Sequence, residues 1–146
     1  MRRLRSRRER PSGWWRSENG QALVEFAIVV PVLLLLILGL VEFSRAWNTK
    51  QVLTDTAREA LRRSVVADPD FTYEEMREMI DRSLIRASLD PQRADVSVEG
   101  WKTGTGNPAR IRIDYEYDLG FFASIAGWAS GDRTLALSTS FVMRNE

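Results

Sequence analysis

An uninterrupted apolar run constrains this chain more than any other feature. Every residue from Phe26 to Val41 is apolar, sixteen in a row. The wider span 22–43 is apolar except for Glu25 and Glu42. A helix rises 1.5 Å per residue, so about 20 apolar residues cross a bilayer. A chain of 146 residues has too little mass to bury such a helix on all sides. The run therefore predicts a single transmembrane helix.

Charge is distributed unevenly around this run. Residues 1–20 hold seven Arg and two Glu, whereas the other 126 residues carry a net charge of −4. Positive charge next to a span stays in the cytoplasm, so we expect residues 1–20 inside and the part after the span outside. A basic arm on a nearly neutral chain does not favour a nucleic-acid-binding body, and we expect no nucleic acid partner.

The absent residue types narrow the function further. The chain has no His and no Cys. It therefore lacks the commonest general base, the thiol nucleophile and the usual zinc ligands. We expect a protein that is not an enzyme, with no cofactor and no metal.

A short motif stands where the basic arm meets the apolar run. The sequence Gly20-Gln-Ala-Leu-Val-Glu25-Phe26 opens the span directly after polar residues. Glu25 within a membrane segment is costly unless it stays near the headgroups or finds a partner. Both explanations remain open on the sequence alone.

This motif resembles the class III signal of type IV pilins and pseudopilins. The resemblance implies that a prepilin peptidase cuts between Gly20 and Gln21, recognising a site that includes Glu25 and Phe26. The cut would remove residues 1–20 and leave a positive α-amine on Gln21, one helical turn from the Glu25 carboxylate. The resemblance further implies that this amine and carboxylate pair, within one chain or between neighbouring subunits.

The following residues narrow the resemblance. The stretch GQALVEFAIVVPVLLLL, followed by GLVEFSR at 39–45 and Ala57-Arg-Glu-Ala60, is similar to the TadE-like family of tight-adherence (Flp, type IVb) pilus assembly proteins. That family implies a structural, membrane-anchored minor pseudopilin in the cytoplasmic (inner) membrane, either in the pilus or at its base. Implied partners are a prepilin peptidase, TadF-like and TadG-like pseudopilins, the major Flp pilin and membrane lipid. The alternative is an unprocessed single-pass protein with an outer binding module.

The part after the span predicts an α+β head. A transmembrane helix at 21–43 continues as an amphipathic stem at 44–67, with an inner stripe that includes Phe43, Trp47, Leu53 and Leu61. The outer head covers 68–146 and begins with a second amphipathic helix, which Thr72 and Glu75 start as a capping box. A small antiparallel sheet of about three strands follows, at 94–99, 110–117 and 134–143.

Three features of the head carry further expectations. In the last strand, Leu135, Leu137 and Phe141 alternate and predict an inner face. Asp114, Glu116 and Asp118 line the outer face of the middle strand, as a solvated surface or a docking patch. The aromatic and apolar residues of 119–129 form either a lid over the core or a contact with a partner or the membrane. Those residues are Phe121, Phe122, Ile125 and Trp128.

Overall fold

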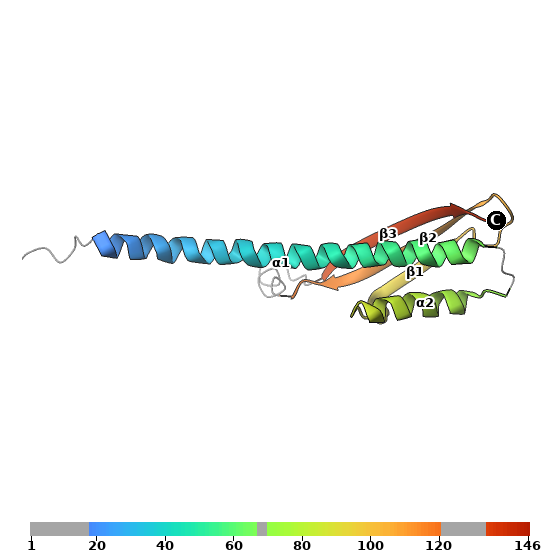
Figure 1. The fold of residues 1–146 in the computed structure, drawn as a ribbon, viewed down its shortest axis with the longest axis horizontal. Coiled ribbons are helices and arrows are strands. Elements are labelled where there is room, and N and C mark those ends of the chain that lie inside the picture. Colours follow the sequence, from blue (N-terminus) through green and yellow to red (C-terminus); the bar gives the residue numbers. More distant parts are fainter. Residues whose placement is uncertain (1–17, 67–69, 121–133) are drawn as a thin grey trace, which may run out of the picture. The chain divides into compact units, whose positions relative to one another are not determined.

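The computed structural model describes residues 18–66, 70–120 and 134–146, in two compact units that divide after Ile37. The elements follow in the order α1 (Glu18–Val65), α2 (Tyr73–Arg86), a 3-10 turn (Pro91–Arg93), β1 (Ala94–Glu99), β2 (Pro108–Asp118) and β3 (Thr134–Arg144) (Figure 1). This is the predicted α+β class, with a long first helix, a second helix and a three-stranded antiparallel sheet.

Helix α1 is 48 residues long and continuous through the boundary predicted at 43/44. The apolar part of this helix is long enough to cross a membrane. An 18-residue stretch of it has a mean hydropathy of 2.9, and none of that stretch is buried. The helix ends at Val65, two residues before the predicted end of the stem.

The inner stripe of the stem is confirmed in its outer half and wrong at its beginning. Leu53 and Leu61 are fully buried, whereas Phe43 and Trp47 are 66% and 58% exposed. At 3.6 residues per turn, Trp47 is rotated about a third of a turn from Leu53. Glu42 lies almost directly in line with Leu53, and it is the residue that is buried.

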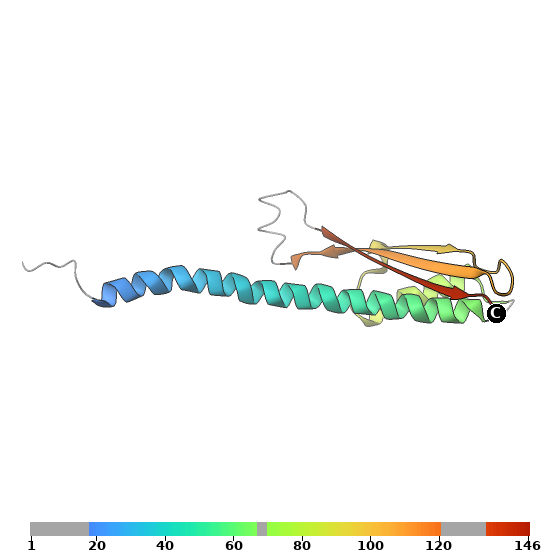
Figure 2. The same cartoon turned by 90° about the horizontal axis from the view of Figure 1, so that it is seen from above.

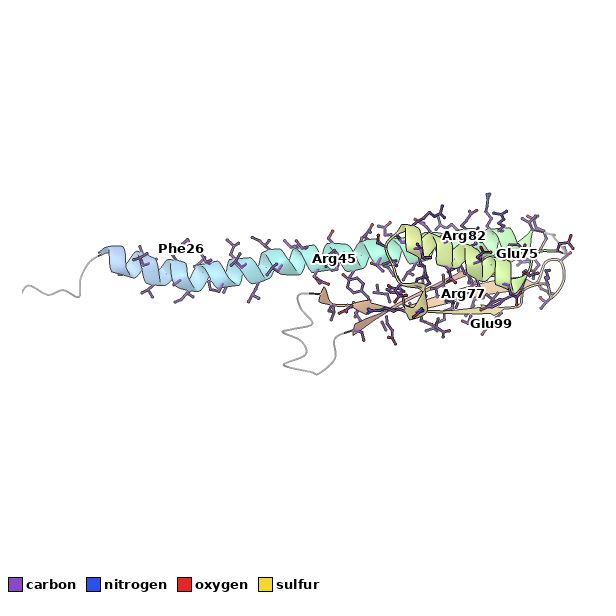
Figure 3. All side chains as sticks on the ribbon, turned by 90° about the horizontal axis from the view of Figure 1, so that it is seen from below. Phe26, Arg45, Glu75, Arg77, Arg82 and Glu99 are labelled. Atoms are coloured by element: carbon purple, nitrogen blue, oxygen red, sulfur yellow. The ribbon has the colours of Figure 1, made fainter. Side chains whose placement is uncertain are left out.

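Helix α2 begins as predicted. The Thr72 hydroxyl accepts a hydrogen bond from the Glu75 amide at 3.2 Å, and the Glu75 carboxylate accepts one from the Thr72 amide at 2.9 Å. These two bonds satisfy amides that would otherwise lack partners in the first turn. The helix then buries Met76, Ile80 and Leu84 at intervals of four residues. Figure 3 shows Glu75 and Arg82 on this helix, with their side chains at the surface.

The sheet has the order β1-β2-β3, with β2 in the middle and both pairings antiparallel. Val96 pairs with Ile113, and Ile111 pairs with Phe141. The inner face of β2 is buried, as its alternation predicted. That face consists of Ala109, Ile111, Ile113, Tyr115 and Tyr117.

On β3 the predicted inner face is confirmed only in part. Leu137 and Phe141 are half-buried, whereas Leu135 is 42% exposed. Leu135 lies at the beginning of an edge strand, so it has a strand neighbour on one side only. Thr139 is the most buried residue of this strand, and its hydroxyl is 3.2 Å from that of Thr54.

The core of the head fills the space between the sheet and the two helices. Both α2 and the 38–65 part of α1 lie on the same side of the sheet (Figures 1 and 2). Leu53 and Leu61 of α1 meet Ile80 of α2 and Ile113 of β2 in a single cluster of buried residues. At one end of the core, the Trp101 indole N–H donates to the Ser64 carbonyl at 2.7 Å.

Candidate processing and assembly site

The residues predicted for processing lie together at the beginning of α1. Gly20, Gln21, Glu25 and Phe26 are all helical and exposed. The Gln21 side-chain amide donates to the Glu25 carboxylate, with 3.2 Å between Nε2 and Oε1. Two positions four residues apart lie on the same face of a helix, so this contact follows from the spacing. Figure 3 labels Phe26 on this stretch.

Gly20 lies in the first turn of α1, which begins at Glu18. Gly lowers helix stability by about 1 kcal/mol relative to Ala.

A second acidic residue, Glu42, lies where the stem meets the sheet. The Tyr117 hydroxyl donates to Glu42 Oε1 at 3.0 Å, and Arg45 Nη1 lies 3.8 Å from Glu42 Oε2. The Glu42 side chain is only 8% exposed and Tyr117 is also buried, whereas the Arg45 side chain is 64% exposed. A Cβ added at Gly120 would lie 3.1 Å from the Glu42 carboxylate. The backbone shortly after β2 therefore also lies close to this carboxylate.

In the sequence alone, Glu42 is an interruption of the apolar span. Its position carries a further signal: eleven residues are just over three full turns, so Glu42 lies on the same face of α1 as Leu53. Its contact with Tyr117 could not be read from spacing, because the two residues are 75 positions apart.

The environment of this cluster changes the acidity of the tyrosine. Burial raises the pKa of the Tyr117 hydroxyl above its usual range, and the hydrogen bond to Glu42 and the charge of that carboxylate raise it further. Both effects disfavour a negative phenolate beside a carboxylate. Tyr117 therefore stays a hydrogen-bond donor to a higher pH than an exposed tyrosine would.

The acidic residues on the outer face of β2 are partly neutralised. Arg112 makes a paired contact with Asp114, with 2.7 Å between Nε and Oδ2, and this hydrogen bonding lowers the pKa of the Asp114 carboxyl. Arg93 lies 3.8 Å from Asp118. Within 18–66, 70–120 and 134–146, no three acidic side chains are grouped in a way that suits a metal ion.

The predicted partner contact at 119–129 cannot be placed. Phe121, Phe122, Ile125 and Trp128 lie outside the described residues. The basic leader up to residue 17 also lies outside them.

Part of α1 is similar to a known protein family. Residues 20–62 match the family model described as TadE-like protein. This segment is therefore similar to the TadE-like family. The resemblance predicted from the sequence is therefore confirmed over Gly20, Glu25 and the stem. Searches of curated proteins and of solved structures returned no match.

The TadE-like match covers the whole apolar helix and most of the stem. It begins at Gly20, the residue after which the predicted cut falls, and it includes Glu42 and Arg45. The rest of the head, including α2 and the sheet, lies outside the matched residues.

Proposed function

We propose that this chain is a membrane-anchored minor pseudopilin that a prepilin peptidase processes, and that it is required for assembly of a type IVb tight-adherence pilus. Its role is structural. The observation that carries the proposal is the TadE-like match beginning at Gly20, with Glu25 five residues later at the start of an exposed apolar helix.

The proposed cut between Gly20 and Gln21 would give the Glu25 carboxylate a positively charged partner. In the uncut chain, the Gln21 side-chain amide is the group that meets the Glu25 carboxylate. Cleavage adds a positive α-amine to the same residue, one turn from the same carboxylate. A charged donor forms a stronger hydrogen bond than a neutral amide does. The pairing of Gln21 and Glu25 would therefore strengthen upon processing, within one chain or with a neighbouring subunit.

The proposed placement is a single pass through the cytoplasmic membrane, with residues 1–20 inside and the head outside. Retention of positive charge on the cytoplasmic side favours this orientation. The proposed partners are the peptidase, TadF-like and TadG-like pseudopilins and the major pilin. Assembly then depends on the apolar part of α1, whose side chains are free to contact lipid or other helices.

The second candidate function is an unprocessed single-pass protein whose head is a binding module. One feature of the head favours it: a groove of about 600 Å³ on the surface of α1 and α2. Its lining combines apolar and charged side chains, among them Glu59, Arg63, Met79 and Ile85. This function needs neither cleavage nor Gly20.

Intact-mass measurement of the membrane-bound protein separates the two functions. The chain is produced with and without a cognate prepilin peptidase, as the natural sequence and as Gly20→Ala. Processing predicts loss of residues 1–20 only when the peptidase is present and Gly20 is retained. Mass is preferable to chemical sequencing, because an N-terminal Gln21 can cyclise and block the sequencing reaction.

The matched control is Gly39→Ala, which makes the same change in the same helix outside the motif. We expect it to be cleaved like the natural sequence. An intact precursor under all conditions would contradict the pseudopilin proposal and favour the binding module.

A further inference from the structure

Two large aromatic side chains are exposed on α1 directly after the apolar run. The rings of Phe43 and Trp47 stack with their centroids 6.1 Å apart. Both are more than half exposed, whereas Glu42 before them and Thr49 after them are buried. Exposed aromatic pairs of this size are costly in water and commonly mark a contact surface.

The position of this pair along α1 indicates what it contacts. The sixteen apolar residues from Phe26 to Val41 extend for about 24 Å as a helix. The hydrocarbon core of a bilayer is about 30 Å thick, and the headgroup layers bring the total to about 40–45 Å. The outer headgroup layer therefore begins within one or two turns after Val41. Phe43 and Trp47 fall within those two turns.

The chemistry of the neighbouring residues fits the same layer. Trp is enriched where a membrane meets water, because its ring is apolar and its N–H is polar. Arg45 lies between the two aromatics in sequence, and its side chain is 64% exposed, so its charge suits a layer of lipid phosphates. The aromatic pair is also continuous along the helix with the lipid-facing run.

We propose that Phe43 and Trp47 lie in the headgroup layer of the outer leaflet and hold the base of the head on the membrane surface. This inference rests on the single-pass placement in the proposed function, but not on cleavage at Gly20. The occupant of the aromatic surface is lipid, and not a protein partner.

The cluster around Glu42 explains how an acidic residue is accommodated at this level. A carboxylate facing anionic phosphates would be repelled. Instead, Glu42 points to the head, where Tyr117 donates to it and Arg45 lies 3.8 Å away. The end of β2 and the backbone of Gly120 then lie at the same level. The end of β2 therefore lies beside the residue that directly precedes the aromatic pair.

Because the chain has no Cys, single-cysteine variants can each carry one spin label. Leu33→Cys, Ser44→Cys and Asp55→Cys place labels at exposed positions on α1 within the run, beside the aromatic pair and farther along the stem. The full chain is reconstituted alone and at low density in vesicles of phosphatidylethanolamine and phosphatidylglycerol. Power saturation with oxygen and a water-soluble nickel chelate then reports the depth of each label.

We expect the Leu33 label to prefer oxygen, the Asp55 label to prefer nickel and the Ser44 label to lie between them. In a Phe43→Ser, Trp47→Ser background, the Ser44 label should shift to the nickel accessibility of Asp55. Ile85→Ser, which removes an exposed apolar side chain from α2, should leave the depth of Ser44 unchanged.

Three results would overturn the inference, and they differ in what else they contradict. If the Leu33 label reports lipid while the Ser44 label is as accessible to nickel as Asp55, the aromatic pair lies in water and awaits a protein partner. If the Leu33 label also reports water, the span is not inserted and the proposed membrane anchoring fails with it. An unchanged Ser44 depth after both aromatic substitutions would also show that the pair does not hold the head there.

Discussion

The hydroxyl of Tyr117 donates a hydrogen bond to the carboxylate of Glu42 across 3.0 Å, and so joins the end of β2 to the beginning of the stem. Glu42 is nearly buried, so its remaining neighbours decide whether its charge is tolerated. Tyr117 and Arg45 supply a donor and an opposite charge. The contact fixes which face of α1 meets the sheet.

Tyr117→Phe is expected to destabilise the head by about 1–3 kcal/mol, because it leaves a buried acceptor without its donor. The measurement is the free energy of unfolding of the full chain in detergent micelles, from denaturant titration. Tyr73→Phe is the matched control: it removes a longer, 3.3 Å bond to the Val96 carbonyl from a side chain that is 41% exposed.

The cost of Tyr117→Phe should depend on the negative charge of Glu42. In a Glu42→Gln background, Tyr117→Phe should cost less than it does beside the carboxylate, since a neutral amide suffers less from losing a donor. An equal cost in both backgrounds would show that the tyrosine stabilises the head through packing rather than through this bond.

Alkaline pH should weaken the head through Tyr117. Because its pKa is raised in the folded state, its contribution is fully present below the ordinary tyrosine pKa of about 10 and is lost as pH rises through the raised value. Unfolding free energies measured between about pH 9 and about pH 11 should fall more steeply for the natural chain than for Tyr117→Phe. Parallel curves would contradict this assignment.

The hairpin between β1 and β2 depends on Gly100. This residue has a φ of +69°, and an added Cβ would collide with the carbonyl oxygen of Pro108. Gly100→Ala should therefore cost about 2–4 kcal/mol, from the left-handed backbone and the collision together. Gly106→Ala is the control, because its φ is +85° and nothing lies within 4 Å; it should cost about 1 kcal/mol. Equal losses in thermal unfolding would rule out the collision.

The start of α2 depends on the side chain of Thr72. Thr72→Ala should lower stability by about 1 kcal/mol, because the Glu75 amide loses its acceptor. Amide hydrogen exchange should then increase first in the opening turn of α2. Thr72→Ser keeps the hydroxyl and should restore both stability and protection; failure of this rescue would assign the loss to the threonine methyl group.

Several elements could be predicted because their evidence is local. The capping box of Thr72 and Glu75 and the alternation of Ile111 and Ile113 involve residues within one turn or one strand. Local backbone geometry determines which face such residues share, so the sequence predicts them without knowledge of the fold.

Which residues of the stem face the core could be seen only in the tertiary structure. Every residue from 26 to 41 is apolar, so this run does not indicate which face of the helix is buried. It therefore gives no information about the faces on which Phe43 and Trp47 lie. We predicted both on the inner stripe, and both are exposed. A polar residue, Glu42, occupies the inner face instead, because Tyr117 and Arg45 satisfy it there.

The sequence by itself therefore determined the α+β class, the membrane-length helix and the family of residues 20–62. These depend on hydropathy, periodicity and short motifs, which act over a few turns or along one strand. Only the tertiary structure decided that Glu42 is buried, that the aromatic pair faces outward and that Leu135 is left partly exposed at a sheet edge. Each of these depends on contacts between segments that are far apart in the sequence. A local sequence pattern does not indicate which distant residues will meet.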